Sequence, residues 1–206
     1  MPARSELPIC GLCGEQQTFF FQVRLNAKTA WRDDSLAVFQ CTECADEQHF
    51  IPPMLEGRLA GAQVTADFLH SYQRNFRVLP FSSHDDLVLR SDSKERIRFS
   101  NWQLTDKASA STTPSFIGGT PEWLQENEAP GGVAGGGVFE FLFQIGAGAE
   151  FGLLDSAPGQ ITLGLDGKPK RSTRKSYQLF LGNQVFFFGA ALNSQPLDVY
   201  VITQRD

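Results

Sequence analysis

The chain has 206 residues, of which 41% are hydrophobic and 20% are charged, with a formal net charge of −5. These values exclude intrinsic disorder and collagen-like repetition. The acidic balance argues against a nucleic-acid-binding protein, whose phosphate contacts need a basic surface, and we expect no nucleic-acid partner. No apolar run is long enough for a secretory signal or a membrane span, so we expect a cytoplasmic protein without a membrane partner.

The first quarter of the chain holds all four cysteines, as the two Cys-x-x-Cys pairs Cys10/Cys13 and Cys41/Cys44. Between the pairs, polar and apolar residues alternate over 18–25, which predicts a β-strand. Residues 35–41 predict a second strand that delivers Cys41. The two pairs therefore flank a hairpin-like excursion.

The spacing of the cysteines favours a zinc site formed by Cys10, Cys13, Cys41 and Cys44, because structural zinc prefers four thiolates in a closed tetrahedron. Gly14 suits a tight knuckle after Cys13, since it can adopt positive φ. A thioredoxin-like redox pair is a weaker alternative, because Cys13 leads into a strand and not into a helix. Disulfides or inert thiols are the remaining alternatives. We interpret His49 as an ordinary surface or loop histidine, with replacement of a ligand or a supporting contact to one as the alternative.

Prolines at 52 and 53 end this region, and Thr65 can cap a helix over 65–76 with one apolar face. Short strands are then expected at 78–81, 86–90 and 96–104. Small polar residues over 107–115, interrupted by a proline, predict a linker.

The second half of the chain is strand-like almost throughout. Strands are expected at 138–145, 161–165, 176–181 and 184–192. The glycines of 131–137 lack the Gly-Lys-Ser/Thr ending of a phosphate-binding loop, so we interpret them as a surface loop. The basic cluster 168–175 is interpreted as a solvated hairpin tip, with an acidic partner as the alternative.

An internal repeat relates the two halves. A shift of 122 residues aligns 6–23 with 128–145 at six identical positions, and places glycines opposite Cys10 and Cys13. A later, gapped match pairs 35–41 with 176–182. We therefore expect two related β-rich units, of which only the first retains the cysteines.

The segment from Ile117 to Gln125, the cysteine knuckle from Cys10 to Gly14 and the strand and knuckle from Ser35 to Cys44 resemble the repeat of the programmed cell death protein 2 family. The chain is also similar to the bacterial YwqG-like family. The resemblance implies zinc-supported domains and, in the best-known members of the first family, escort of a newly made ribosomal protein. The motifs are divided between the two halves here, so no particular client is implied.

Together these observations predict a mainly β protein, α+β by strict count, made of two antiparallel β-rich units with one or two short helices. The first unit spans 1–106 and carries the zinc knuckle, and the second spans 116–206; the two can pack as one compact domain. Candidate partner-contact residues in the second unit are Gly118, Gly119, Pro121 and Trp123, although core packing is the stronger expectation for the tryptophan.

Catalytic signals are sparse: the sequence has three histidines, and neither a Gly-x-Ser-x-Gly nor a His-Glu-x-x-His motif. The predicted function is therefore a non-enzymatic, zinc-stabilised protein-interaction or chaperone-like protein with a protein partner. The alternative is an enzyme or small-ligand-binding protein with a cleft between the two units.

Overall fold

The computed structural model describes residues 6–25, 31–45, 60–82, 92–102, 104–106, 115–193 and 195–204, and the described chain is mainly β, as predicted. Its elements, in chain order, are β1 (Thr18–Arg24), β2 (Asp34–Gln40), β3 (Gln63–Val64), α1 (Ala66–Ser71), β4 (Phe76–Ser82), β5 (Thr105–Asp106), β6 (Phe116–Ile117), β7 (Gly132–Val133), β8 (Val138–Ile145), β9 (Glu150–Gly152), β10 (Ile161–Leu163), β11 (Pro169–Arg171), β12 (Ser176–Gln178), the 3₁₀ turn η3 (Leu179–Gly182), β13 (Gln184–Leu192) and β14 (Gln195–Gln204). None of the helices in the described ranges has the length and apolar character needed to cross a membrane.

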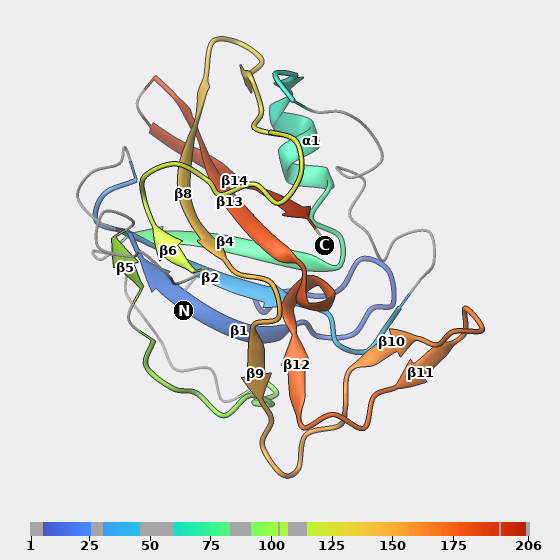
Figure 1. The fold of residues 1–206 in the computed structure, drawn as a ribbon. Helices are drawn as coiled ribbons and strands as arrows, with labels where there is room; N and C mark the ends of the chain where they lie inside the picture. The colour runs from blue at the N-terminus through green and yellow to red at the C-terminus, as the bar shows by residue number, and fades with distance from the viewer. Residues whose placement is uncertain are drawn as a thin grey trace.

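Two antiparallel sheets form the body of the molecule (Figure 1). One has the order β1-β2-β4, and the other has the order β14-β13-β8-β6-β5, in which β5 joins β6 in parallel. Phe21 of β1 contacts Phe143 of β8 and Phe187 of β13, with ring centroids 6.2 and 6.4 Å apart. One continuous hydrophobic core therefore joins residues of both halves of the chain.

Smaller elements surround these sheets. β9 pairs with β12, β3 pairs in parallel with β7, and β10 and β11 form a hairpin that projects from the body (Figure 1). Between β12 and β13, the turn η3 places Phe180 and Leu181 at φ angles of 44° and 64°. The N–H of Phe180 donates to Oε1 of Gln40 at 2.9 Å, which anchors this left-handed turn to the end of β2.

The predicted strands over 18–25, 35–41, 138–145 and 184–192 correspond to β1, β2, β8 and β13. The predicted helix is shorter than expected: Thr65 caps it by accepting from the N–H of Phe68 at 3.1 Å, but α1 ends at Ser71 and Phe76 already begins β4. The expected strand over 96–104 is wrong for the part of it that the structure describes, 96–102 and 104, where Ile97 alone makes an isolated bridge. The expected strand at 86–90, His49 and the linker before residue 115 lie outside the described residues.

The strands that the predicted repeat relates to one another share a β-bulge at the same position. β1-β2-β4 and β8-β13-β14 are both antiparallel arrangements of three strands. β1 bulges at Phe20 and β8 bulges at Leu142, two positions related by the 122-residue shift (142 − 20). The gapped match is wrong, because residues 176–182 form β12 and η3, whereas β13 is the neighbour of β8. The bulges support a duplication, and the division into two units stays a prediction.

All three tyrosines of the chain have pKa values raised by burial, those of Tyr72 and Tyr200 most strongly. The folded protein therefore holds these protons more tightly than the unfolded chain, whose tyrosines titrate near pH 10. Stability contributed by the three groups is fully present below about pH 10 and is lost as the pH rises further. We expect tyrosinate absorbance to appear together with unfolding. Normal titration near pH 10 in a chain that is still folded would contradict this burial.

Substitution of two glycines by alanine should have very different effects on stability. A Cβ at Gly189 would lie 2.6 Å from Cε2 of Trp31, a side chain with no exposed surface, and closer still to its Nε1. Gly189→Ala should therefore lower the free energy of unfolding by about 1–3 kcal/mol, as overpacking does. Gly152→Ala is the matched control, since no atom lies within 4 Å of that Cβ. Chemical denaturation of both variants measures the difference, and equal effects would refute the close approach.

Candidate metal centre

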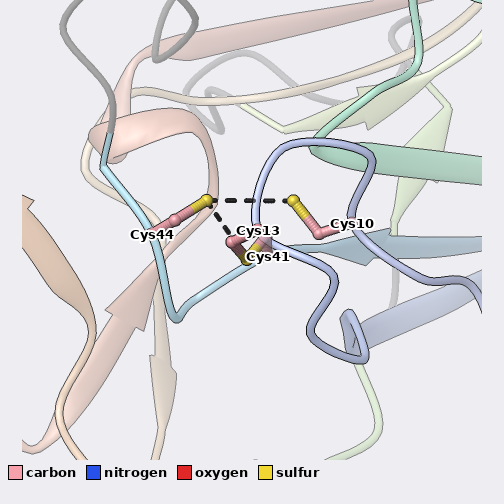
Figure 2. A group of neighbouring side chains, drawn as sticks. All are labelled: Cys10, Cys13, Cys41 and Cys44. Carbon is pink, nitrogen blue, oxygen red and sulfur yellow. Dashed lines mark hydrogen bonds between the residues drawn. The ribbon is translucent and has the colours of Figure 1, made fainter.

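The two Cys-x-x-Cys pairs come together at the ends of β1 and β2, as the sequence predicts. Their four Sγ atoms all lie within 4.8 Å of one another. Figure 2 shows Cys10 on the loop before β1 and Cys41 and Cys44 on the loop after β2, with their sulfur atoms turned toward a common point. Cys13 is exposed and Cys10 and Cys41 are buried, so the cluster lies at the surface with one side open to solvent.

The spacing of the sulfur atoms suits a tetrahedral metal ion. Distances between Sγ atoms are 3.8 Å for Cys10 and Cys44, 3.6 Å for Cys13 and Cys41, and 3.5 Å for Cys41 and Cys44. Zn–S bonds of about 2.3 Å place tetrahedral sulfur atoms about 3.8 Å apart, whereas a disulfide requires about 2.05 Å. The four cysteines are free thiols whose arrangement fits a thiolate-bound metal ion.

Backbone hydrogen bonds shape the first knuckle. The N–H of Gly14 donates to the carbonyl of Cys10 at 2.9 Å, and Gly14 has a φ of 77°, as expected for this position. The N–H of Gly11 donates to the carbonyl of Arg74 at 2.7 Å. These bonds fix the turn that directs Cys10 and Cys13 to the same side.

The second knuckle is attached to the segment before β4. The N–H of Cys41 donates to the carbonyl of Asn75 at 2.7 Å, and the N–H of Glu43 approaches Sγ of Cys41 at 3.4 Å. An N–H directed at sulfur stabilises a thiolate over a thiol, as a metal ligand requires. Hydrogen bonds to neighbouring backbone thus position both knuckles.

Hydrogen bonds between sulfur atoms couple the ionisation of Cys10, Cys41 and Cys44. Hydrogen bonds from the thiols of Cys41 and Cys44 lower the pKa of Cys10 to about 2. As donors in these hydrogen bonds, the two other thiols hold their protons more tightly. The hydrogen bond to Cys10 is the main cause that raises the pKa of Cys41 to about 12, and it also raises the pKa of Cys44. Deprotonation of Cys41 and Cys44 beside a Cys10 thiolate therefore needs a cation at the centre.

A charged residue inside the second knuckle connects it to distant parts of the chain. Glu43, with 14% of its side chain exposed, forms ion pairs with Arg96, 10% exposed, and with Arg171 of β11, whose Nη2 lies 2.9 Å from its Oε2. Burial alone would raise the pKa of the Glu43 carboxyl, but the hydrogen bond from Arg171 and the charge of Arg96 hold that pKa below its usual range. Sequence reasoning missed this network; the available signal was an acidic residue between two cysteines.

The neighbouring Thr42 extends this connection. Its Oγ1 lies 2.9 Å from Oγ1 of Thr18 and accepts from Nη1 of Arg96 at 3.0 Å. Its carbonyl accepts from the N–H of Ile161 at 2.9 Å, at the start of β10. The second knuckle therefore contacts both the first sheet and the β10-β11 hairpin.

The other candidate residues lie elsewhere. Trp123 packs against the core, with its ring centroid 4.4 Å from that of Phe186, as core packing predicts. Gly118 and Gly119 have φ angles of 70° and 76° and form a turn, and Pro121 is half-buried beside it. The structure brings none of these four residues to the cysteine cluster.

The basic cluster 168–175 lies on and after β11, all of whose residues are exposed. Arg171 pairs with Glu43, and Arg174 pairs with Glu150 at 3.3 Å. Two of its five cations therefore bind the protein's own carboxylates, which agrees with the interpretation as a solvated hairpin.

A cavity of about 710 Å³ lies beside β1. Six consecutive residues of β1, Phe19 to Arg24, form one wall, and residues 97–102 form the opposite wall. Residues of the second half of the chain, among them Ile117, Ile145 and Phe151, also line it. We call this cavity the β1 groove.

Comparison with known proteins returns no family model, no curated protein and no solved structure that matches this chain.

Proposed function

We propose that this chain is a non-enzymatic, zinc-stabilised protein-interaction or chaperone-like protein of the cytoplasm. The observation that carries the proposal is the convergence of four cysteine sulfur atoms within 4.8 Å of one another. An ion bound by four thiolates has no open position for water or substrate, so it stabilises structure and does not catalyse. We propose zinc as the ion because a tetrahedral site of four thiolates is typical of structural zinc.

The binding part of the proposal draws support from exposed aromatic side chains. Phe99 and Trp102 are 53% and 50% exposed, and both line the β1 groove. Large apolar side chains grouped at a surface cavity favour contact with another molecule. The resemblance to the programmed cell death protein 2 family, whose best-known members escort another protein, supports the same conclusion without assigning a client.

Quantitative affinity purification from the native cells tests the proposal. We expect a protein to co-purify with the zinc-loaded chain at a fixed ratio after crosslinking, and to be lost after mild chelation that releases the metal. A chain that purifies alone under these conditions, while retaining its zinc, would contradict the interaction function.

A small-ligand-binding protein or an enzyme is the second candidate, and the β1 groove is the observation that favours it. Its lining combines residues of both halves of the chain, and its volume lies in the range of about 300–1,000 Å³ that is typical of ligand sites. A thermal-shift screen of metabolites separates the two candidates. A small molecule that raises the melting temperature and contacts the groove, without any protein partner, would replace the first candidate by the second.

A further inference from the structure

The β1 groove follows the edge of a sheet. Successive residues of a strand point to opposite faces, yet six consecutive residues of β1 line this cavity. The wall is therefore the backbone edge of β1 together with the side chains on both sides of it. β1 is the outer strand of its sheet, because β2 is its partner there and no other described strand pairs with it.

The register shows which backbone groups face the groove. The N–H of Leu25 donates to the carbonyl of Asp34 at 3.0 Å, so the pair that they form is hydrogen-bonded. Hydrogen-bonded and non-hydrogen-bonded pairs alternate along an antiparallel ladder. Arg24 and Gln22 therefore belong to non-hydrogen-bonded pairs. Their N–H and C=O groups point away from β2. Both residues are exposed and line the groove, and no backbone group of the described chain pairs with these atoms.

The opposite wall carries two aromatic side chains among polar residues. Trp102 stacks on Phe151 with ring centroids 5.2 Å apart, and Phe99 packs against Phe19 at 5.3 Å. The N–H of Arg98 donates to the carbonyl of Gly152 at 2.7 Å, which fixes this wall to β9. The groove thus offers backbone donors and acceptors on one side and aromatic surfaces on the other.

The charged residues of the groove differ in whether they have an ion-pair partner. Glu150 is paired with Arg174 at 3.3 Å and Arg98 is paired with Asp155 at 3.4 Å, whereas Arg24 forms no ion pair with any described residue. The strand TFFFQVR contains no carboxylate, so pairing of β1 with β1 of a second copy would leave Arg24 without a counter-charge. A different chain that carries an acidic residue is the complementary occupant.

We propose that the β1 groove binds an extended segment of a partner protein, which adds a strand to β1. The segment bonds to the backbone of Gln22 and Arg24, places apolar side chains against Phe99 and Trp102, and directs a carboxylate to Arg24. This inference rests on the proposed protein-binding function and specifies how the partner binds.

Selection of linear dodecapeptides from a random phage-displayed library, on the full-length zinc-loaded protein, tests this inference. We expect enriched peptides to alternate apolar and polar residues around an aspartate or glutamate. Methylation of alternate backbone nitrogens of such a peptide should weaken its binding at least tenfold, because it removes strand pairing. In the complex, hydrogen exchange at the amides of Gln22 and Arg24 should slow.

Two protein variants sharpen the test. Gln22→Pro removes an N–H that faces the groove without removing a bond to β2, and should weaken peptide binding at least tenfold. Gln22→Thr keeps the N–H and is the matched control, which should bind normally. Arg24→Glu should change the selected peptides from acidic to basic, a result that does not depend on how well the proline variant folds.

Each other outcome overturns the inference. Enriched peptides that bind equally well after backbone methylation would place the binding site elsewhere and leave the protein-interaction function intact. Failure to enrich any peptide, while a partner co-purifies from cells, would exclude an extended ligand. Protection of the Gln22 and Arg24 amides that increases with protein concentration alone would identify a second copy as the occupant.

Discussion

Cys13→Ser should abolish stoichiometric zinc binding, so that elemental analysis changes from about one zinc per chain to none. Cys13 is the exposed member of the cluster, so the substitution itself leaves no buried cavity. Loss of the ion removes its whole contribution to folding, which for structural zinc in small domains is about 10–16 kcal/mol of apparent binding free energy. We therefore expect a fall of several kcal/mol in the free energy of unfolding, with the largest increase in hydrogen exchange around the two knuckles.

Glu15→Ser is the control for this substitution. Glu15 lies in the same knuckle, and its side chain forms an exposed ion pair with Lys94 at 3.3 Å, which contributes less than about 1 kcal/mol. Zinc content and stability should both stay close to those of the natural chain. A Cys13→Ser protein that melts at the original temperature would refute a structural role for the metal, and so would freshly purified natural protein that contains no metal.

Glu43→Ala should destabilise the protein more than removal of any surface charge. The substitution leaves the guanidinium of Arg96 largely buried and without its carboxylate, which costs about 3–5 kcal/mol where an ion pair is buried. Chemical denaturation measures this loss directly. Because Glu43 lies between two metal ligands, we also expect weaker zinc affinity, measured by competition with a chelator.

Variants of the two arginines separate the parts of this network. Arg171→Met removes a cation that is 46% exposed, and solvent screening limits its effect to about 1 kcal/mol or less. Combining Glu43→Leu with Arg96→Met removes both buried charges together and should restore much of the stability lost by Glu43→Ala. If the double substitution is as destabilising as the sum of the single ones, the ion pair has no energetic coupling.

The sequence predicted the elements whose pattern is local and regular. Alternation over 138–145 and a continuous apolar run over 184–192 identified β8 and β13 with their observed bounds, since both patterns are local in the sequence. β14 was missed, because Pro196 and Asp198 interrupt the apolar pattern at its start, and pairing with β13 makes it a strand. Residues 72–76 were assigned to the helix for the opposite reason: their apolar spacing suits a helix, but β2 pairs with Phe76 and extends the chain there.

In the candidate site too, the local features were predicted from the sequence and the long-range ones were not. Spacing alone identified the four cysteines, because each Cys-x-x-Cys pair is a local turn and the number of ligands is complete. The partners of Glu43 lie 53 and 128 residues away in the chain, and no sequence pattern relates residues at such separations. The β1 groove likewise depends on which strand is left at a sheet edge, a property of the whole topology.

The ion pairs of Glu43 also have a consequence for the order of folding. All four cysteines precede Arg96 and Arg171 in the chain, and Arg171 follows Cys44 at a long separation. Contacts between distant residues form slowly, because a long loop must close before they contribute. Metal uptake should therefore precede completion of the core, and in refolding of the full chain the thiolate absorbance of added Co²⁺ should appear before the tryptophan fluorescence of the native state. The ion would then act as an early folding nucleus, and the β10-β11 hairpin would dock against it last.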